Sequence, residues 1–252
     1  MAKRTSDPHA VSTPDGDARG FSFALEFDTS VTPVRLSLRA LHRVGFGSIS
    51  IDWAQPELQR RIAAGKRQPL ARAVGLHKPQ TRPLRILDAT AGLGRDGYTL
   101  AALGAEVTLA ERNATVVELL RDAHRRALAD PAQCSVAARI DILAVDAAEV
   151  LDGARAWDVI YLDPMYPDDG KRALPSKEMQ ILRDLNGGDD DADALLAPAL
   201  NAALGRVVVK RPAKAPHLAD RAPSMSLNST QLRFDVYIHA NAPSQRDVEI
   251  RK

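Results

Sequence analysis

The sequence predicts an α/β protein built around a mostly parallel sheet with helices on both faces. Strand-like and helix-like segments alternate from residue 84 to residue 211, and such alternation implies right-handed crossovers between parallel strands. The strand candidates are also apolar enough to be covered on both faces. They are Leu84–Asp88, Glu106–Glu111, Ile140–Asp146, Asp158–Asp163 and Arg206–Arg211. The helix candidates between them are Tyr98–Leu103, Thr115–Leu128, Ala147–Leu151 and Ala192–Leu204.

Smaller units are expected on either side of this core. Residues 1–20 are rich in Pro, Asp, Ser and Gly, which predicts a disordered tail. Val34–Leu38 and Ser48–Trp53 alternate in polarity and indicate a small β unit, followed by a basic helix over Glu57–Val74 and a linker at 75–83. Ser226–Leu232 and Phe234–His239 predict a closing antiparallel hairpin. The expected organisation is a tail at 1–20, a β and helical region at 21–80, and the main domain at 81–252.

Composition narrows the class of protein. A chain of 252 residues, 45% of them hydrophobic, can bury a substantial core. It has no apolar run long enough to span a bilayer, and Met1 to Asp17 contain no apolar signal core, so a cytoplasmic protein without membrane contact is expected. The single cysteine, Cys134, excludes an intrachain disulfide and a cysteine-based zinc cluster. Because the net charge is only +2, any nucleic-acid surface must be a local patch.

A short acidic stretch, Asp189–Asp191 with Asp193, could suggest a metal site. It runs into a helix candidate, where aspartates ordinarily cap the helix and compensate its dipole. The glycine and glutamate spacing of a calcium loop is absent. We therefore expect no metal.

The first strand candidate runs into the glycine-rich loop Asp88-Ala-Thr-Ala-Gly92-Leu-Gly94-Arg95-Asp96-Gly97. The spacing G-x-G-x-x-G, with Glu111 about 20 residues further on, is typical of dinucleotide dehydrogenases, and that class stays open. Two features favour S-adenosylmethionine (SAM). The charge of Asp88 would face a pyrophosphate, whereas SAM carries a cationic sulfonium and amino group. Arg95 and Asp96 could clamp an amino-acid carboxylate and amine, and D-x-x-x-G-x-G is typical of SAM-dependent methyltransferases.

The next two strand candidates also end in acids. Glu111, followed by Arg112, can accept hydrogen bonds from both ribose hydroxyls of the cofactor. Asp146, followed by Ala147, can accept from the adenine amino group, or it can cap the next helix. The sequence leaves these two roles of Asp146 open.

The fourth strand candidate leads into Asp163-Pro164-Met165-Tyr166. This cluster suits methyl transfer to a ring amine, whose lone pair is delocalised into the base. A carboxylate and a backbone carbonyl that accept its two N–H bonds favour a pyramidal nitrogen, and a neighbouring ring can hold the base by stacking. The motif resembles the [D/N]-P-P-[Y/F] of amine-directed nucleic-acid methyltransferases, with Met165 in place of the second proline. An ordinary turn starting at Asp-Pro is the competing interpretation.

Seven motifs occur in order along the chain: Asp88 to Asp96, Glu111-Arg112-Asn113, Tyr161 to Pro167, Lys177-Glu178-Met179, Asp191-Ala192-Asp193, Val207 to Pro212 and Arg233 to Tyr237. Together they resemble the RsmJ family, bacterial enzymes that methylate N2 of a guanine in small-subunit ribosomal RNA. The resemblance implies a Rossmann-like class I SAM-dependent methyltransferase with a seven-stranded sheet and a small N-terminal β-containing region. It also implies SAM contacts at Arg95, Asp96, Glu111, Arg112, Asp146, Ala147 and Asp163. Family members often carry a Ser pair at 146–147 and Phe at 166.

The expected mechanism is direct in-line transfer without a covalent enzyme intermediate. Asp163 and the Pro164 carbonyl would orient the amine, and Tyr166 would stack on the base. Lys210 and Arg211 follow the fifth strand candidate and are candidates for RNA phosphate contact, with Lys171 and Lys177 as weaker ones. The expected partner is small-subunit ribosomal RNA, naked or assembled, with no obligate protein partner. A DNA or protein-glutamine amine methyltransferase, or a non-catalytic RNA-binding protein with a relic SAM pocket, stays open.

Overall fold

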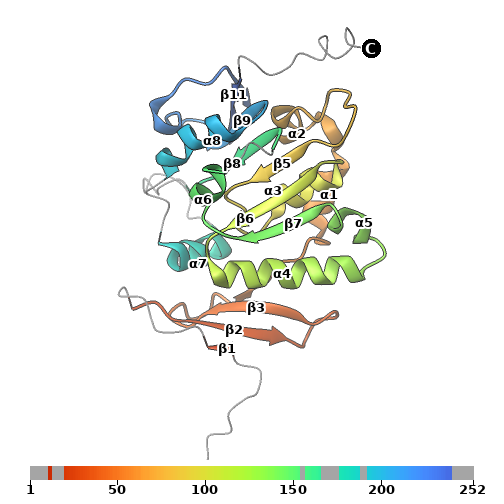
Figure 1. Ribbon diagram of the computed structural model, residues 1–252. Coiled ribbons are helices and arrows are strands. Elements are labelled where there is room, and N and C mark those ends of the chain that lie inside the picture. The colour runs from red at the N-terminus through yellow and green to blue at the C-terminus, as the bar shows by residue number, and fades with distance from the viewer. Residues whose placement is uncertain (1–10, 13–19, 154–156, 166–175, 188–191, 240–252) are drawn as a thin grey trace, which may run out of the picture.

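The computed structural model describes residues 11–12, 20–153, 157–165, 176–187 and 192–239. Seven strands within these ranges form one sheet, in the order β10-β11-β9-β8-β5-β6-β7 (Figure 1). All neighbours from β9 to β7 are parallel, and β11 is antiparallel to both β9 and β10. The mostly parallel sheet is therefore confirmed. Its strands are β5 (Arg85–Asp88), β6 (Glu106–Glu111), β7 (Ile140–Ala144), β8 (Val159–Leu162), β9 (Arg206–Pro212), β10 (Met225–Asn228) and β11 (Leu232–Ile238).

Side chains of successive strand residues enter two different cores, because they point to opposite faces of the sheet. Ile86 and Val208 pack in the core on the face covered by α3 (Arg95–Ala102) and α4 (Ala114–Ala129). Their neighbours Leu87 and Val207 pack in the core on the face covered by α6 (Ala147–Leu151) and α8 (Leu196–Ala202). Figure 1 shows α4 on one side of the sheet and α6 and α8 on the other. Each fully buried aliphatic side chain contributes about 1.5–3 kcal/mol to this arrangement.

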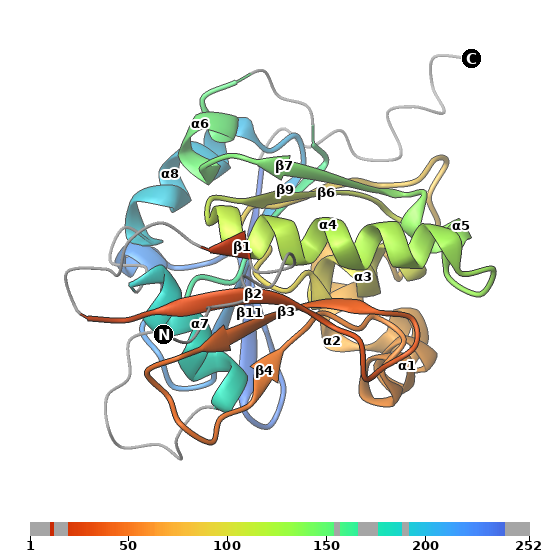
Figure 2. The same ribbon diagram turned by 90° about the horizontal axis from the view of Figure 1, so that it is seen from below.

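A second, antiparallel sheet lies against the outer side of α4 (Figures 1 and 2). It consists of β1 (Val11–Ser12), β2 (Phe23–Asp28), β3 (Arg35–Ala40) and β4 (Ser48–Ile49). Leu38 of β3 belongs to the same hydrophobic core as Leu119 and Leu120 of α4. Asp122 of α4 accepts a hydrogen bond of 3.1 Å from the Leu36 backbone N–H. The small sheet thus shares a core with the main sheet's helical layer, and the division at residue 80 stays a prediction.

The predicted basic helix is interrupted. The structure has α1 (Pro56–Ala63), the 3₁₀ turn η1 (Gly65–Arg67) and α2 (Pro69–Val74) in its place. Gly65 adopts a φ of +67°, which ends a right-handed helix, and Pro69 starts the next one at its first position. Within the predicted tail, Val11 pairs with Leu25 and Ser12 with Ala24 of β2, and the disorder of the tail stays a prediction.

Three further boundaries differ from the sequence predictions. β7 stops at Ala144 because Asp146 caps α6. The predicted helix at 192–204 begins as the 3₁₀ turn η2 (Ala192–Leu195), and the closing hairpin turns at 229–231. Three elements were not predicted from the sequence: α5 (Cys134–Ala137), α7 (Lys177–Asn186) and the turn η3 (Leu218–Asp220). None of the helices in the described ranges has the length and apolar character needed to cross a membrane.

Candidate active site

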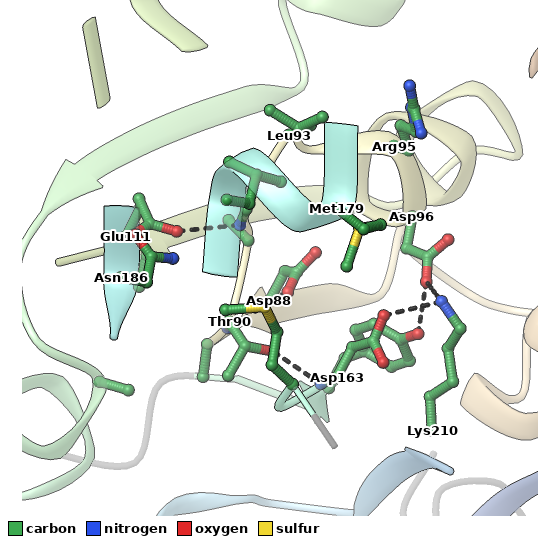
Figure 3. A pocket seen from close by; sticks show the side chains of 18 of the residues that line it. Asp88, Thr90, Leu93, Arg95, Asp96, Glu111, Asp163, Met179, Asn186 and Lys210 are labelled. Carbon is green, nitrogen blue, oxygen red and sulfur yellow. Dashed lines mark hydrogen bonds and ion pairs between the residues drawn. The ribbon is translucent and has the colours of Figure 1, made fainter. Parts of the chain in front are cut away.

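A cavity of about 440 Å³ opens at the carboxyl ends of β5, β6 and β8 (Figure 3). The strand order reverses between β5 and β8, and open α/β sheets bind ligands at that point. A volume of this size is in the usual range for a small-molecule site. Of the ten residues predicted to bind the cofactor, nine line it: Asp88, Gly92, Arg95, Asp96, Glu111, Arg112, Asp146, Ala147 and Asp163.

The glycine loop between β5 and α3 shapes one wall. Gly92 has a φ of +53°, and a Cβ built on it would meet no atom within 4 Å, so its backbone faces open space that a ligand can approach. Gly94, the tenth predicted residue, does not line the cavity. A Cβ there would lie 2.9 Å from Leu120 Cδ2, so this glycine permits close packing behind the loop. Gly97 similarly lets α3 approach β6.

Glu111 fixes the other end of the loop. Its Oε2 accepts a hydrogen bond of 3.0 Å from the Gly92 N–H, and its Oε1 accepts one of 2.8 Å from the Asn113 N–H. The residue is 7% exposed and lies at the tip of β6. A carboxylate can accept about four hydrogen bonds, so these two do not prevent it from accepting from ribose hydroxyls. The position fits the role predicted for Glu111.

Asp146 caps the next helix, which is one of the two roles that the sequence left open, and it also borders the cavity. Its side chain accepts a hydrogen bond of 2.9 Å from the Ala148 N–H and thereby caps α6. The same residue lines the cavity, with its Oδ2 3.6 Å from Arg112 Nη1. The cap thus holds the carboxylate at the cavity wall, and its contact with adenine stays a prediction.

The floor of the cavity is a network of charged side chains around Asp96. Arg61 Nη1 lies 2.5 Å from Asp96 Oδ1, and the Tyr161 hydroxyl donates to Asp96 Oδ2 at 2.5 Å. Lys210 Nζ bridges Asp96 Oδ2 at 3.1 Å and Asp163 Oδ2 at 2.7 Å (Figure 3). Five elements, α1, α3, β8, β9 and the segment after β8, thus meet through ion pairs and one phenolic hydrogen bond.

Burial and neighbouring charges shift the pKa values of these groups. Burial opposes ionisation of Asp96, but Lys210 and Arg61 hold the pKa of that carboxyl well below its usual range. Burial raises the pKa of Asp163, and Lys210 counteracts part of that rise. Burial also raises the pKa of Asp88 well above its usual range, with Asp96 and Asp163 adding to the effect. The sequence argument that assigned a full charge to Asp88 is weakened, because burial opposes the charged form of this carboxyl.

The helix α7 closes the cavity opposite the sheet. Glu178, near its start, pairs with Arg95 at 2.7 Å, and Asn186 at its end accepts a hydrogen bond of 2.9 Å from Asn113 Nδ2. Met179 and Leu182 supply the apolar lining between these two contacts (Figure 3). Arg95, predicted to clamp a ligand carboxylate, therefore also fastens α7.

The outer face of α7 is held by the N-terminal region. Asp184 pairs with Arg43 and His42, which follow β3. Lys177 donates to the Gly45 carbonyl at 3.1 Å. The cavity wall is thus fixed from both sides by residues distant in sequence.

Sequence reasoning missed several cavity residues, among them Arg61, Thr90 and Asn186. Thr90 Oγ1 accepts a hydrogen bond of 2.6 Å from the Asp163 N–H and so positions the candidate motif. The signals for the α7 lining were the motif Lys177-Glu178-Met179 and the helical spacing of residues 179, 182 and 186.

Two of the three predicted catalytic residues, Asp163 and Pro164, lie within the described residues. Asp163 lines the cavity, and 37% of its side-chain surface is exposed. Pro164, the next residue in the sequence, is buried. Tyr166, and the RNA candidate Lys171, lie outside the described residues.

The predicted phosphate contacts at Lys210 and Arg211 require a correction. β9 continues to Pro212, so both residues lie within the strand and point to opposite faces of the sheet. Lys210 points into the cavity and pairs with two carboxylates. Arg211 is 6% exposed and donates to the Pro216 carbonyl at 3.2 Å, so its guanidinium is not available at the surface.

No group of three or more potential metal ligands gathers within the described ranges. Asp193, the described member of the acidic stretch, accepts a hydrogen bond of 2.8 Å from the Ala219 N–H. Asp189–Asp191 lie outside the described residues.

Comparison with known proteins agrees with this geometry. The family model "Putative SAM-dependent methyltransferase" matches residues 20–239. The chain is 46% identical over 198 residues to ribosomal RNA small subunit methyltransferase J of Pseudomonas paraeruginosa, covering 76% of this chain and 74% of that protein. It is 43% identical over 221 residues to the protein of the same name from Colwellia psychrerythraea, covering 87% and 80%. A crystal structure of a SAM-dependent methyltransferase from Neisseria gonorrhoeae matches with a TM-score of 0.62 and 34% identity, covering 85% and 82%.

Proposed function

Because the chain belongs to the SAM-dependent methyltransferase family that includes ribosomal RNA small subunit methyltransferase J, we propose that it methylates the exocyclic N2 amine of a guanine in small-subunit ribosomal RNA. Family membership rules out the dehydrogenase alternative. The naked RNA and the assembled subunit are both candidate substrates, and a cytoplasmic location follows from either. The observation that carries the proposal is the position of Asp163, at the tip of β8 on the rim of the cofactor cavity.

The residues around the cavity fit SAM part by part. Glu111 would accept from the ribose hydroxyls and Asp146 from the adenine amino group. The open approach to the Gly92 backbone leaves room for the cofactor between them. Arg95 and Asp96 lie toward the other end of the cavity, where the amino-acid part would bind. Bound SAM supplies an electrophilic methyl group, which forms a bond to nitrogen as its bond to sulfur breaks and the electron pair stays on sulfur.

Asp163 would bind and orient the amine of the substrate. Its carboxylate accepts an N–H of the guanine amine, which turns the nitrogen lone pair toward the methyl group. The Pro164 carbonyl would accept the second N–H, and Tyr166 would stack on the base. After transfer the nitrogen carries an extra proton, and Asp163 or water takes it. The anchoring of the Asp163 N–H on Thr90 supports this role, because it fixes the motif against β5.

A local basic surface supports an RNA partner despite the low net charge. Residues 55–80 contain six Lys or Arg and one Glu, a net +5, whereas the whole chain carries +2, so the rest sums to −3. The segment's exposed cations, called here the basic face, are Arg60, Lys66, Arg67, Arg72 and Lys78. In the described part of the chain, no ion pair involves any of these five. The pKa of the nearby His77 is lowered, first by burial and then by the positive charges of Lys78 and Arg72.

The basic face begins beside the cavity mouth. Arg60 neighbours Arg61 on α1, and Arg61 lines the cavity with Gln55 and Leu58. RNA phosphates bound along this face would therefore lead toward Asp163. We propose that the basic face takes over the role first predicted for Lys210 and Arg211, with Lys177 as a further candidate.

The test of the function is methylation of small-subunit RNA and of assembled small subunits by the purified protein with isotope-labelled SAM, followed by mass mapping. We expect one methyl group on N2 of one guanine. Methylation of duplex DNA or a protein glutamine, with none on ribosomal RNA, would contradict the proposal. Neutralising Arg60 and Arg67 to Gln should weaken RNA binding and lower the salt slope by up to about two phosphate equivalents. The same change at Arg121 and Arg125, exposed on α4, is the matched control.

A further inference from the structure

Lys210 is a cation placed directly on the carboxylate that the proposed reaction uses. Its ammonium lies 2.7 Å from Asp163 Oδ2 and 3.1 Å from Asp96 Oδ2, and its side chain is 20% exposed (Figure 3). The residue comes from β9, the strand next to β8 in the sheet. A lysine that served only as a phosphate contact would point its charge outward, whereas this one is directed into the cavity.

The other contacts of Asp96 make it an anchor for Lys210. Arg61 binds its Oδ1 at 2.5 Å, and the Tyr161 hydroxyl donates to its Oδ2 at 2.5 Å. Asp96 is itself 8% exposed and lies in the first turn of α3. With Asp96 held on both oxygens, the ammonium it binds has a defined position relative to Asp163.

Asp163 receives this ammonium on one oxygen. Within the described ranges, its Oδ2 accepts from Lys210 and its Oδ1 accepts no hydrogen bond. The Asp163 N–H is fixed on Thr90 Oγ1, so the backbone of the residue is held as well. One carboxylate oxygen is therefore occupied by the protein, and the other is left for a donor that enters the cavity.

We propose that Lys210 is a positioning residue for methyl transfer: by holding Oδ2 of Asp163 it orients Oδ1 toward the N–H of the target amine. This inference rests on the proposed amine methylation and assigns a role within the same site. It gives β9 a part in the reaction that neither the glycine loop nor the Asp-Pro motif contains. Lys210 touches neither reacting atom in this scheme, so it acts through Asp163.

Electrostatics give the same lysine a second effect. An amine acceptor has to be ionised, since a protonated carboxyl would present its own donor to the substrate. Burial raises the pKa of Asp163, and Asp96 adds to that rise, whereas Lys210 and the more distant Arg61 lower it. Burial opposes the charge on Lys210, but Asp163 and Asp96 together raise its pKa. The titratable groups facing Asp163 are thus Lys210, Asp96, Arg61, Asp88 and Tyr161.

The experiment compares Lys210→Met, which removes the charge, with Lys210→Arg, which keeps it. Lys214→Met, at an exposed position just past β9, is the matched control. We expect Lys210→Met to slow single-turnover methylation about 100-fold at saturating RNA and SAM, with SAM affinity within about threefold of wild type. The acid limb of its pH–rate profile should move to higher pH, because Asp163 loses the cation that lowers its pKa. Lys210→Arg should keep the limb near that of wild type.

A measurement without substrate separates this inference from the proposed function. Carbon-13 NMR titration of the Asp163 carboxyl, assigned with Asp163→Asn, should show a higher pKa in folded Lys210→Met than in wild type. An unchanged carboxyl titration, or a slower rate with an unmoved acid limb, would overturn the positioning role and leave Lys210 a structural residue. If wild-type protein methylates no ribosomal RNA while the NMR shift is observed, the proposed function fails instead.

Discussion

Replacing Glu111 by alanine gives the sharpest test of how the cavity holds its cofactor. Glu111 is 7% exposed, so solvent screens its charge little. Its two oxygens hold the backbone N–H groups of Gly92 and Asn113 at 3.0 and 2.8 Å, which sets the loop that borders the ribose position. The change removes this support together with the charge-assisted bonds to the ribose hydroxyls. At the usual strength of such bonds, SAM binding should weaken by about 1–3 kcal/mol, or about 5- to 150-fold in Kd.

Isothermal calorimetry with SAM measures this loss directly, and thermal unfolding gives an independent value. At saturating SAM the stabilisation by ligand should fall by the same 1–3 kcal/mol, which corresponds to about 2–12 °C of Tm shift for a chain of this size. Glu149→Ala, an exposed acid on α6 outside the cavity lining, is the control and should bind SAM normally. A folded Glu111→Ala variant that binds SAM within about twofold of wild type would refute the ribose role.

Three other changes test the rest of the site and the fold. Asp163→Ala should lower the single-turnover rate by about 100-fold or more with a smaller effect on SAM affinity, and near-normal turnover at saturating SAM would show that it is not the amine acceptor. Gly97→Ala would place a Cβ 2.3 Å from Leu109 Cδ2, so calorimetric Tm should drop by about 2–8 °C for a cost of about 1–2 kcal/mol; an unchanged Tm would mean that Leu109 repacks. Arg43 lowers the pKa of Asp184, so the ion pair stabilises the fold above the unfolded pKa of about 4 and is lost as pH falls through the folded value. Asp184→Asn should therefore be less stable by about 1–3 kcal/mol at pH 7 in denaturant titration, the difference should shrink as the pH falls below about 4, and a pH-independent difference would contradict this.

Local sequence patterns were sufficient to predict the main sheet and the carboxylates at the strand tips that line the cavity. The alternation of apolar strands and helices predicted the sheet, because each strand buries both faces within its own few residues. The tips of β5, β6 and β8 meet at one edge in any parallel sheet of this order, so Asp88, Glu111 and Asp163 were expected in one place. The carboxylates that line the cavity thus followed from contiguous motifs and topology.

Errors arose where a residue's role depends on register or on a distant partner. Lys210 and Arg211 were expected to present their charges at the end of the strand Arg206–Arg211, but β9 runs to Pro212, and neighbouring residues of a strand point to opposite faces of the sheet. The partners of Lys210 lie 47 and 114 residues away in sequence, at Asp163 and Asp96. No local pattern relates these positions.

The sequence by itself determined the fold class, the cofactor loop, the acids at the strand tips and the family to which the chain belongs. Each of these depends on short motifs, in which the residues that determine the chemistry are close together in sequence. Only the tertiary structure decided that Lys210 serves the cavity, that Arg61 completes its floor and that α7 forms its wall. Those assignments come from packing between elements far apart in sequence, and packing also buries Asp88 and thereby raises the pKa of its carboxyl.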